Sequence, residues 1–280
     1  MPQNISRRTM LRFSAGMAAV CATGLPALAA DEPAKKIPIG LQLYSVRTAC
    51  TNDLPAVLEA VAKMGYQGVE FAGYYGRKAP DLRRLLDQNG LKCCGTHTGW
   101  DTVQPKNWDA TVEFNKTIGN KYLIVPGLPG AREASAEACK ETAKMFSEMA
   151  AKAKELDMRV GYHAHGGDFK KFNGETAWDI IFANSTDDVV MQLDIGNCIG
   201  GGGDPYAILK KFPGRATTIH LKPWGKRNAV IGEDDVRWNE IWELCEKPGK
   251  TEWYIVEYEE DPAKVDSVKR CIENLRRMGK

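Results

Sequence analysis

Six side chains that could bind a metal ion or move a proton lie at or just after the ends of short apolar runs in this sequence. They are His97, His163, His165, His220, Asp194 and Glu257. If these runs are parallel strands of one barrel, their carboxyl ends open onto the same face, so residues far apart in sequence meet in one pocket. The pattern therefore predicts a single site.

Imidazole and carboxylate groups together are typical ligands of Mn, Fe, Co or Zn, whereas Mg²⁺ is less suited to imidazole. We expect the metal ligands to be His163, Asp194, His220 and Glu257, with Mn²⁺ as the leading candidate and Co, Fe, Zn or Mg as alternatives. His165 lies two residues after His163 and would point to the same side of an extended strand. One of these two imidazoles could therefore bind the metal while the other contacts substrate.

Eight apolar runs alternate with helical patterns after residue 36. The runs span residues 39–44, 68–71, 91–96, 122–125, 159–162, 189–193, 217–219 and 253–256. They lack the alternation of charged and apolar residues that a half-exposed strand would show, so we expect both faces to be covered. Helices are predicted between them, for example over 53–65, 79–88 and 133–156, with Asp53 as a helix N-cap.

Strict alternation of strands and helices implies that the strands pair in parallel through right-handed crossovers. Eight such units predict an α/β fold, namely a single (β/α)₈ TIM barrel over residues 37–280. The alternative is an open doubly wound sheet, which normally carries a glycine-rich phosphate turn after its first strand. This chain has Leu43-Tyr44-Ser45-Val46-Arg47 there. Its glycine run at 200–203 leads into Asp204-Pro205, which is typical of a helix start.

The first 29 residues have the pattern of a twin-arginine export signal. Arg7 and Arg8 precede an apolar stretch that ends in Ala27-Leu28-Ala29, a sequence suited to cleavage. The apolar stretch is shorter than the roughly 20 residues that span a bilayer, so we expect no stable membrane anchor. The prediction is a signal at 1–29, a linker at 30–36, the twin-arginine translocase as a partner during export, and a periplasmic or secreted product.

Charge and cysteine content limit the classes of partner. Cleavage would remove three arginines and no acidic residue, so the formal net charge would change from +2 to −1. A nearly neutral chain lacks the basic surface of a nucleic-acid binder. Of the eight cysteines, seven would remain, an odd number without CxxC spacing, which predicts buried thiols. The sequence leaves a homo-oligomer open.

Several short motifs together resemble the sugar isomerase/epimerase family with the xylose isomerase-like barrel. They are Gly-Tyr-His163-Ala-His165, Gln-Leu-Asp194-Ile-Gly-Asn, Asp204-Pro205, Gly-Arg215, Ile-His220-Leu-Lys222 and Ile-Val-Glu257-Tyr. The resemblance runs from about Ile37 to the C-terminal helix. It implies that a Glu, an Asp, a His and a second Glu hold the metal, and that the two glutamates move the proton.

This chain departs from that pattern at the first glutamate, where His163 stands, as in barrels resembling inosose dehydratases. A relay between two glutamates therefore cannot be carried over intact. Glu70, near the end of Gly-Val-Glu-Phe, is a candidate for the missing acid/base, although a structural role at the barrel mouth is equally consistent with its position.

The resemblance implies a metal-dependent sugar isomerase/epimerase whose ligand is a small-molecule sugar or keto-sugar. Such an enzyme removes a proton α to a carbonyl and passes through an enediolate. We expect Glu257, Glu70 and His165 to be catalytic. The expected substrate-binding residues are His97, Lys222, Trp224 and Arg215. One alternative is a 3-keto-glycoside lyase or dehydratase acting by β-elimination. Others are a non-catalytic exported sugar-binding barrel and an endonuclease IV-like repair enzyme, which would need more ligands than four histidines supply.

Overall fold

The computed structural model describes residues 36–247, 250–260 and 264–280. The predicted signal at 1–29 and all of the linker except Lys36 lie outside these residues. No helix in the described ranges combines the length and the apolar character needed to cross a bilayer.

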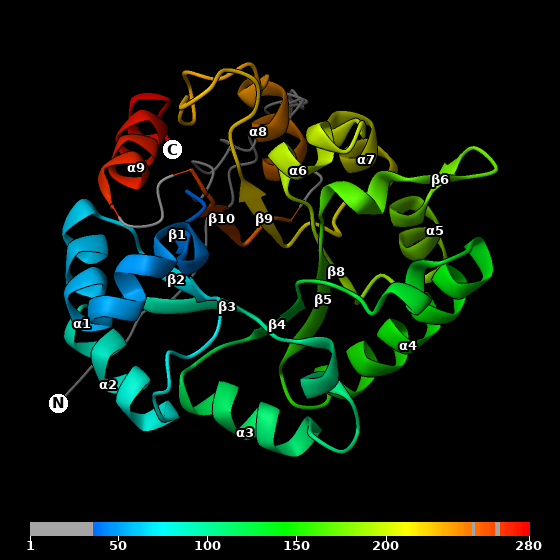
Figure 1. Ribbon diagram of the computed structural model, residues 1–280, viewed down its shortest axis with the longest axis horizontal. Coiled ribbons are helices and arrows are strands. Elements are labelled where there is room, and N and C mark those ends of the chain that lie inside the picture. Colours follow the sequence, from blue (N-terminus) through cyan, green and yellow to red (C-terminus); the bar gives the residue numbers. More distant parts are fainter. Residues whose placement is uncertain (1–35, 248–249, 261–263) are drawn as a thin grey trace, which may run out of the picture. The chain divides into compact units, whose positions relative to one another are not determined.

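Eight parallel strands form the centre of the described part of the chain, as the sequence predicted (Figure 1). Along the ring their order is β8-β5-β4-β3-β2-β1-β10-β9. Their bounds are β1 Ile39–Gln42, β2 Gly68–Phe71, β3 Lys92–His97, β4 Tyr122–Val125, β5 Arg159–His163, β8 Val190–Gln192, β9 Thr218–Leu221 and β10 Trp253–Val256. The fold is therefore a nearly closed TIM barrel.

The ring closes between β8 and β9 through few backbone contacts. Asp194 and His220 form an isolated parallel bridge. The amide of Met191 donates to the carbonyl of Arg215 at 2.9 Å, and the amide of His220 donates to the carbonyl of Leu193 at 3.0 Å. The closing seam thus joins two of the predicted metal ligands directly.

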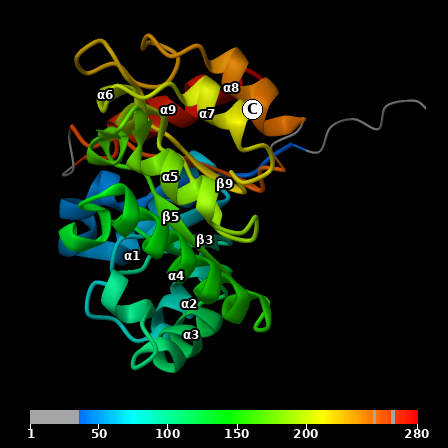
Figure 2. The same ribbon diagram turned by 90° about the vertical axis from the view of Figure 1, so that its right-hand side faces the viewer.

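Helices surround the strands in both views of the barrel (Figure 1 and Figure 2). Their bounds are α1 Arg47–Met64, α2 Ala79–Gln88, α3 Trp108–Thr117, α4 Ala136–Lys154, α5 Ala177–Asn184, α6 Ile195–Gly200, α7 Pro205–Lys211, α8 Trp238–Glu246 and α9 Asp266–Arg277. A short antiparallel hairpin, β6 Lys171–Phe172 with β7 Glu175–Thr176, was not predicted; it lies between β5 and α5.

Local capping explains where several helices begin. Asp53 lies inside α1 at a kink with φ −154° and ψ 82°, and its Oδ1 accepts a hydrogen bond from the amide of Ala56 at 3.1 Å. It therefore acts as the predicted N-cap, although helical structure already begins at Arg47. Asp204 caps α7 in the same way, which confirms the helix start predicted at Asp204-Pro205.

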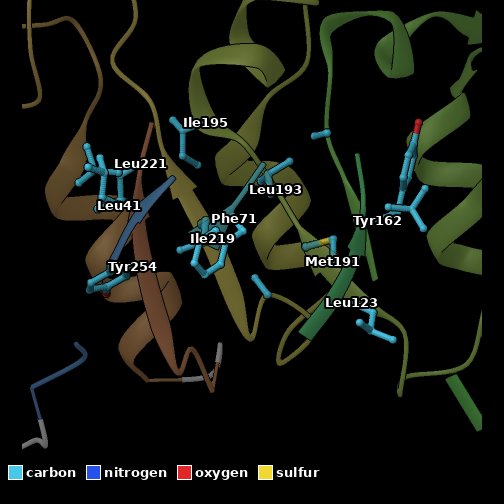
Figure 3. Packing of buried hydrophobic residues seen from close by; sticks show 14 of the residues in the cluster. Leu41, Phe71, Leu123, Tyr162, Met191, Leu193, Ile195, Ile219, Leu221 and Tyr254 are labelled. Carbon is cyan, nitrogen blue, oxygen red and sulfur yellow. The ribbon is translucent and has the colours of Figure 1, made fainter. Parts of the chain in front are cut away.

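The apolar core lies between the strands and the helices. Side chains alternate along each strand, so Ile219 and Leu221 of β9 point away from the barrel axis while Thr218 and His220 point toward it. Figure 3 shows three of these buried residues, Leu41 of β1, Leu221 of β9 and Tyr254 of β10. The seven cysteines of the described residues are all buried and unpaired, as predicted.

Candidate active site

The structure brings the four expected metal ligands together at the carboxyl ends of the strands. His163 ends β5, His220 lies on β9, Asp194 follows β8 and Glu257 follows β10. One potential ligand atom from each residue lies within 4.8 Å of the others, and all four residues are buried. We call these residues the ligand cluster.

His220 is held between two carboxylates. Its Nδ1 contacts Oε2 of Glu257 at 2.7 Å, and its Nε2 contacts Oε2 of Glu70 at 2.6 Å. Burial by itself lowers the pKa of His220, but the charges of Glu70 and Glu257 outweigh this and raise it to about 10. If a metal ion were bound at Nδ1, the Nε2–H of His220 could still donate a hydrogen bond to Glu70. A hydrogen bond from a metal-bound histidine to a carboxylate orients the imidazole in many metal sites.

Asp194 carries a buried oxygen that is free to bind a cation. Its Oδ1 accepts the amide of Asn197 at 2.7 Å and so caps α6, whereas Oδ2 is buried without a hydrogen-bond partner. Oδ2 lies 3.8 Å from Nδ1 of His220. Burial and the neighbouring charge of Glu257 raise the pKa of Asp194 to about 7. An unsatisfied buried carboxylate oxygen facing an imidazole and a second carboxylate fits a divalent metal ion.

Gln192 sets the proton positions of two histidines. Its Nε2 donates to Oε1 of Glu70 at 2.8 Å and to Oγ1 of Thr218 at 3.1 Å. Its Oε1 must therefore face Nε2 of His97 and Nδ1 of His163, both at 3.1 Å. A carbonyl oxygen only accepts, so both imidazoles donate to it. Burial lowers the pKa of both histidines, and Nε2 of neutral His163 remains available as a ligand atom.

Glu70 lies beneath the ligand cluster and has no exposed surface. It accepts hydrogen bonds from Gln42 at 2.7 Å, from Gln192 and from His220. Burial alone would raise the pKa of Glu70, but the adjacent His97 and His220 lower it below its usual value. A Cβ at Gly95 would lie 2.3 Å from Oε1 of Glu70, so only glycine leaves room there. Through these contacts Glu70 orients His220, which agrees with the structural role that its position in the sequence left open beside a catalytic one.

Lys222 places a positive charge beside Glu257. Its Nζ lies 3.3 Å from Oε1 of Glu257 and donates to Oδ1 of Asn197 at 2.9 Å; it also pairs with Glu259. His165 is exposed next to the ligand cluster, with its ring centroid 4.8 Å from that of His163. Both side chains can therefore contact a substrate that enters from the mouth of the barrel.

His97 ends β3, and Trp224 lies in the loop after β9. Trp224 is 44 % exposed, and a Cβ at Gly200 would come within 2.8 Å of its ring, so this ring lies against the last residue of α6. The ring centroids of His97 and His163 are 4.6 Å apart. Each residue borders a cavity next to the ligand cluster.

The position of Arg215 contradicts its expected role in substrate binding. Arg215 precedes β9 and therefore lies at the amino end of the barrel, away from the ligand cluster. Its guanidinium is buried and donates to the carbonyls of Phe182 and Val189 and to the hydroxyl of Ser185. Arg215 lies only five residues before His220 in sequence. The strand β9 runs from the amino end of the barrel to its carboxyl end, however, so the two residues lie at opposite ends of the barrel. Arg215 is a structural residue.

Replacing Arg215 by Ala is expected to lower the free energy of unfolding by about 2–4 kcal/mol, because buried carbonyl groups would lose their donors. Metal content and kcat/KM should not change in the folded fraction. Urea unfolding and metal analysis of the same preparation measure the two effects. If the variant lost activity but kept its stability, Arg215 would contribute to substrate binding after all.

Several polar residues of this site were not predicted from the sequence. They are Gln42, Gln192, Asn197, Thr218 and Glu259. The signal that could have found two of them is an amide inside an otherwise apolar strand, as in Ile-Gly-Leu-Gln42 and Val-Met-Gln192. A buried amide needs partners, and here those partners are the carboxylate and the imidazoles of the site.

Similarity to known proteins agrees with this architecture. An inosose dehydratase from Lacticaseibacillus casei is 23% identical over 248 residues, which cover 75% of this chain and 83% of the relative. The structure of a sugar phosphate isomerase/epimerase from Parabacteroides distasonis aligns with a TM-score of 0.75 at 24% identity, covering 86% of this chain and 98% of the other. The IolI protein with a zinc atom aligns with a TM-score of 0.65 at 14% identity over 87% and 96%.

These solved structures share the fold, and their low identity carries no further conclusion. The family described as Xylose isomerase-like TIM barrel matches residues 58–278, most of the described chain. This match agrees with the fold predicted from alternating strands and helices. It also agrees with the motifs at the strand ends. The chain belongs to the xylose isomerase-like TIM barrel family.

Proposed function

We propose that this protein is a metal-dependent enzyme that removes a proton α to the carbonyl of a keto-sugar or keto-polyol and then expels a β-substituent. The observation that carries the proposal is the buried ligand cluster of His163, Asp194, His220 and Glu257 beside the Lys222 ammonium. Two imidazoles and two carboxylates suit Mn²⁺, our leading candidate, or Co, Fe, Zn or Mg. Such an ion supplies Lewis-acid stabilisation of a developing enediolate.

Residues of the chain supply the proton transfer. Burial would raise the pKa of Glu257, but its hydrogen bond to His220 holds that pKa well below the usual value, so Glu257 is ionised and can accept the α-proton. Lys222 lies 3.3 Å from Oε1 of Glu257 and places positive charge where the enediolate oxygen would form. His165 is exposed at the mouth and can bind the departing hydroxyl.

Elimination is favoured over epimerisation because of the position of Glu70. Epimerisation needs two proton-transfer groups on opposite faces of the substrate, and Glu70 is fully buried below the ligands. Elimination needs one base, which Glu257 supplies. Curated relatives named inosose dehydratase support the same choice. An isomerase or epimerase is the second candidate, since the exposed imidazole of His165 could serve as the other proton-transfer group.

NMR of the Mn²⁺-loaded protein in D₂O tests this function, with 3-keto-glucose and a keto-inositol as separate substrates. We expect deuterium to replace the α-proton and a dehydrated product to accumulate. A rearranged sugar without dehydration would instead establish the isomerase or epimerase. If neither substrate exchanges its α-proton while the metal is bound, the proposal is wrong for this class of substrate.

A further inference from the structure

A cavity of about 500 Å³ opens next to His97, on the side of the barrel formed by the loops after β2 and β3 and by α3. Its lining includes Tyr74, His97, Ala110 and Phe114. Small-molecule sites usually enclose roughly 300–1,000 Å³, so the cavity is large enough for a ligand group. His97 connects the cavity to the ligand cluster, because its ring centroid is 4.6 Å from that of His163.

The wall of this cavity combines aromatic rings with neutral polar groups. The rings of Tyr74 and Phe114 have centroids 4.1 Å apart, and hydroxyl or amide groups of Thr98, Thr111 and Asn115 lie around them. This mixture suits a ring that has apolar faces and a polar edge, which aromatic side chains and hydroxyl groups recognise together.

Charge separates this cavity from the second one beside the cluster. Among the described residues, the lining of the His97 cavity contains no lysine, arginine, aspartate or glutamate. The other cavity, of about 330 Å³, is lined by Lys222, Lys226 and Arg227 together with Glu259 and Glu260. A phosphate group in the His97 cavity would find no lysine or arginine of the lining to pair with.

We propose that the cavity beside His97 is a second subsite that binds an uncharged ring attached to the keto-sugar, so that the substrate is a neutral glycoside. This inference rests on the proposed function, because the keto-sugar itself must lie over the ligand cluster. The attached ring is either a second sugar or an aromatic aglycone; both offer the uncharged, flat-faced surface that Tyr74 and Phe114 would contact.

The reaction balances without a further reactant. For a 3-keto-glycoside, Glu257 takes the proton from C2, and the electron pair of that C–H bond forms the enediolate. The C3 carbonyl then reforms, a C1=C2 double bond forms and the C1–O bond breaks. The electron pair of that bond goes to the oxygen of the attached ring, which takes up the proton that Glu257 removed. The products are an unsaturated keto-sugar and the free alcohol or phenol.

Substitution of Ala110 by Trp tests the subsite. Ala110 is exposed on α3 and lines the cavity, so an indole there would occupy the cavity without entering the core. The matched control is Glu113→Trp, an exposed position of the same helix outside the cavity lining. The probes are p-nitrophenyl 3-keto-glucoside, a 3-keto-glucosyl disaccharide, 3-keto-glucose and its 6-phosphate.

In the wild-type protein we expect kcat/KM to be higher for at least one neutral glycoside than for 3-keto-glucose. The Ala110→Trp variant should lower the ratio of these two values about tenfold, mainly through KM, which corresponds to the loss of about 1.4 kcal/mol of binding. Glu113→Trp should leave the ratio as it is. The aryl and disaccharide probes identify which ring the cavity prefers.

An unchanged ratio in Ala110→Trp, or a preference of the wild type for the 6-phosphate over both glycosides, would overturn the subsite. Failure of the proposed function has a different signature, the absence of α-proton exchange in 3-keto-glucose. In that case calorimetric binding of the p-nitrophenyl glycoside to the metal-loaded wild type and to Ala110→Trp still tests the cavity. Equal affinity of the two proteins would also contradict the subsite.

Discussion

The Asp194→Asn variant is expected to bind Mn²⁺ at least about 100-fold more weakly while its metal-free fold stays as stable as the wild type, or becomes more stable. The amide keeps an Oδ1 that caps α6 through the amide of Asn197. It removes the negative charge from Oδ2, the buried oxygen that has no hydrogen-bond partner. It also removes the repulsion between Asp194 and Glu257.

The pH dependence of stability provides a second measurement on this variant. The native pKa of Asp194 is raised from 3.8 to about 7, so the native state holds a proton that the unfolded chain has already lost. This residue's contribution to the free energy of unfolding is therefore present below about pH 4 and is lost as the pH rises to about 7. In metal-free buffer, Asp194→Asn should gain stability over the wild type as the pH rises through this window.

Isothermal titration with Mn²⁺ and urea unfolding in EDTA at pH 5 and pH 8 measure the two effects separately. A variant that binds Mn²⁺ as tightly as the wild type would remove Asp194 from the metal site. A variant that is destabilised equally at both pH values would show that the charge of Asp194 holds the metal-free fold together.

Replacing Glu257 by Gln is expected to lower the rate of α-proton exchange about 1,000-fold at saturating Mn²⁺, because an amide cannot accept the proton. The amide oxygen can still accept a hydrogen bond from Nδ1 of His220, so the fold should persist. Metal affinity should also fall, since Glu257 belongs to the ligand cluster. Single-turnover exchange in D₂O over a series of Mn²⁺ concentrations separates the two losses.

Glu259→Gln is the matched control. Glu259 also pairs with Lys222 but lies outside the ligand cluster. Its substitution should reduce exchange less than tenfold, because Lys222 keeps its contacts with Glu257 and Asn197. Similar losses in the two variants would mean that the charge of Lys222, and not a base at Glu257, limits the reaction.

Much of the fold could be predicted because its signals are local. Strands covered on both faces are continuous apolar runs, and caps such as Asp53 and Asp204 act on amides two or three residues away. The predicted strands 68–71, 122–125 and 253–256 agree with the structure. The predicted run 39–44 ends early, because Leu43–Val46 turns into a 3₁₀ helix in which Oε1 of Gln42 accepts the amide of Tyr44.

The sequence alone predicted that His163, Asp194, His220 and Glu257 meet, because parallel strands in a barrel bring their carboxyl ends to one face whatever the distance along the chain. It left open which of His163 and His165 is the ligand. Only the tertiary structure decided the roles of Glu70, Gln192 and Arg215. Glu70 and Gln192 are 122 residues apart, and their hydrogen bond depends on which side of each strand faces the barrel axis. Arg215 is near His220 in sequence, but it lies at the other end of β9, and its buried partners come from α5 and the loop after it. Side-chain direction and contacts between distant strands are properties of the folded barrel, so the local pattern could place these residues near strands but could not assign what they contact.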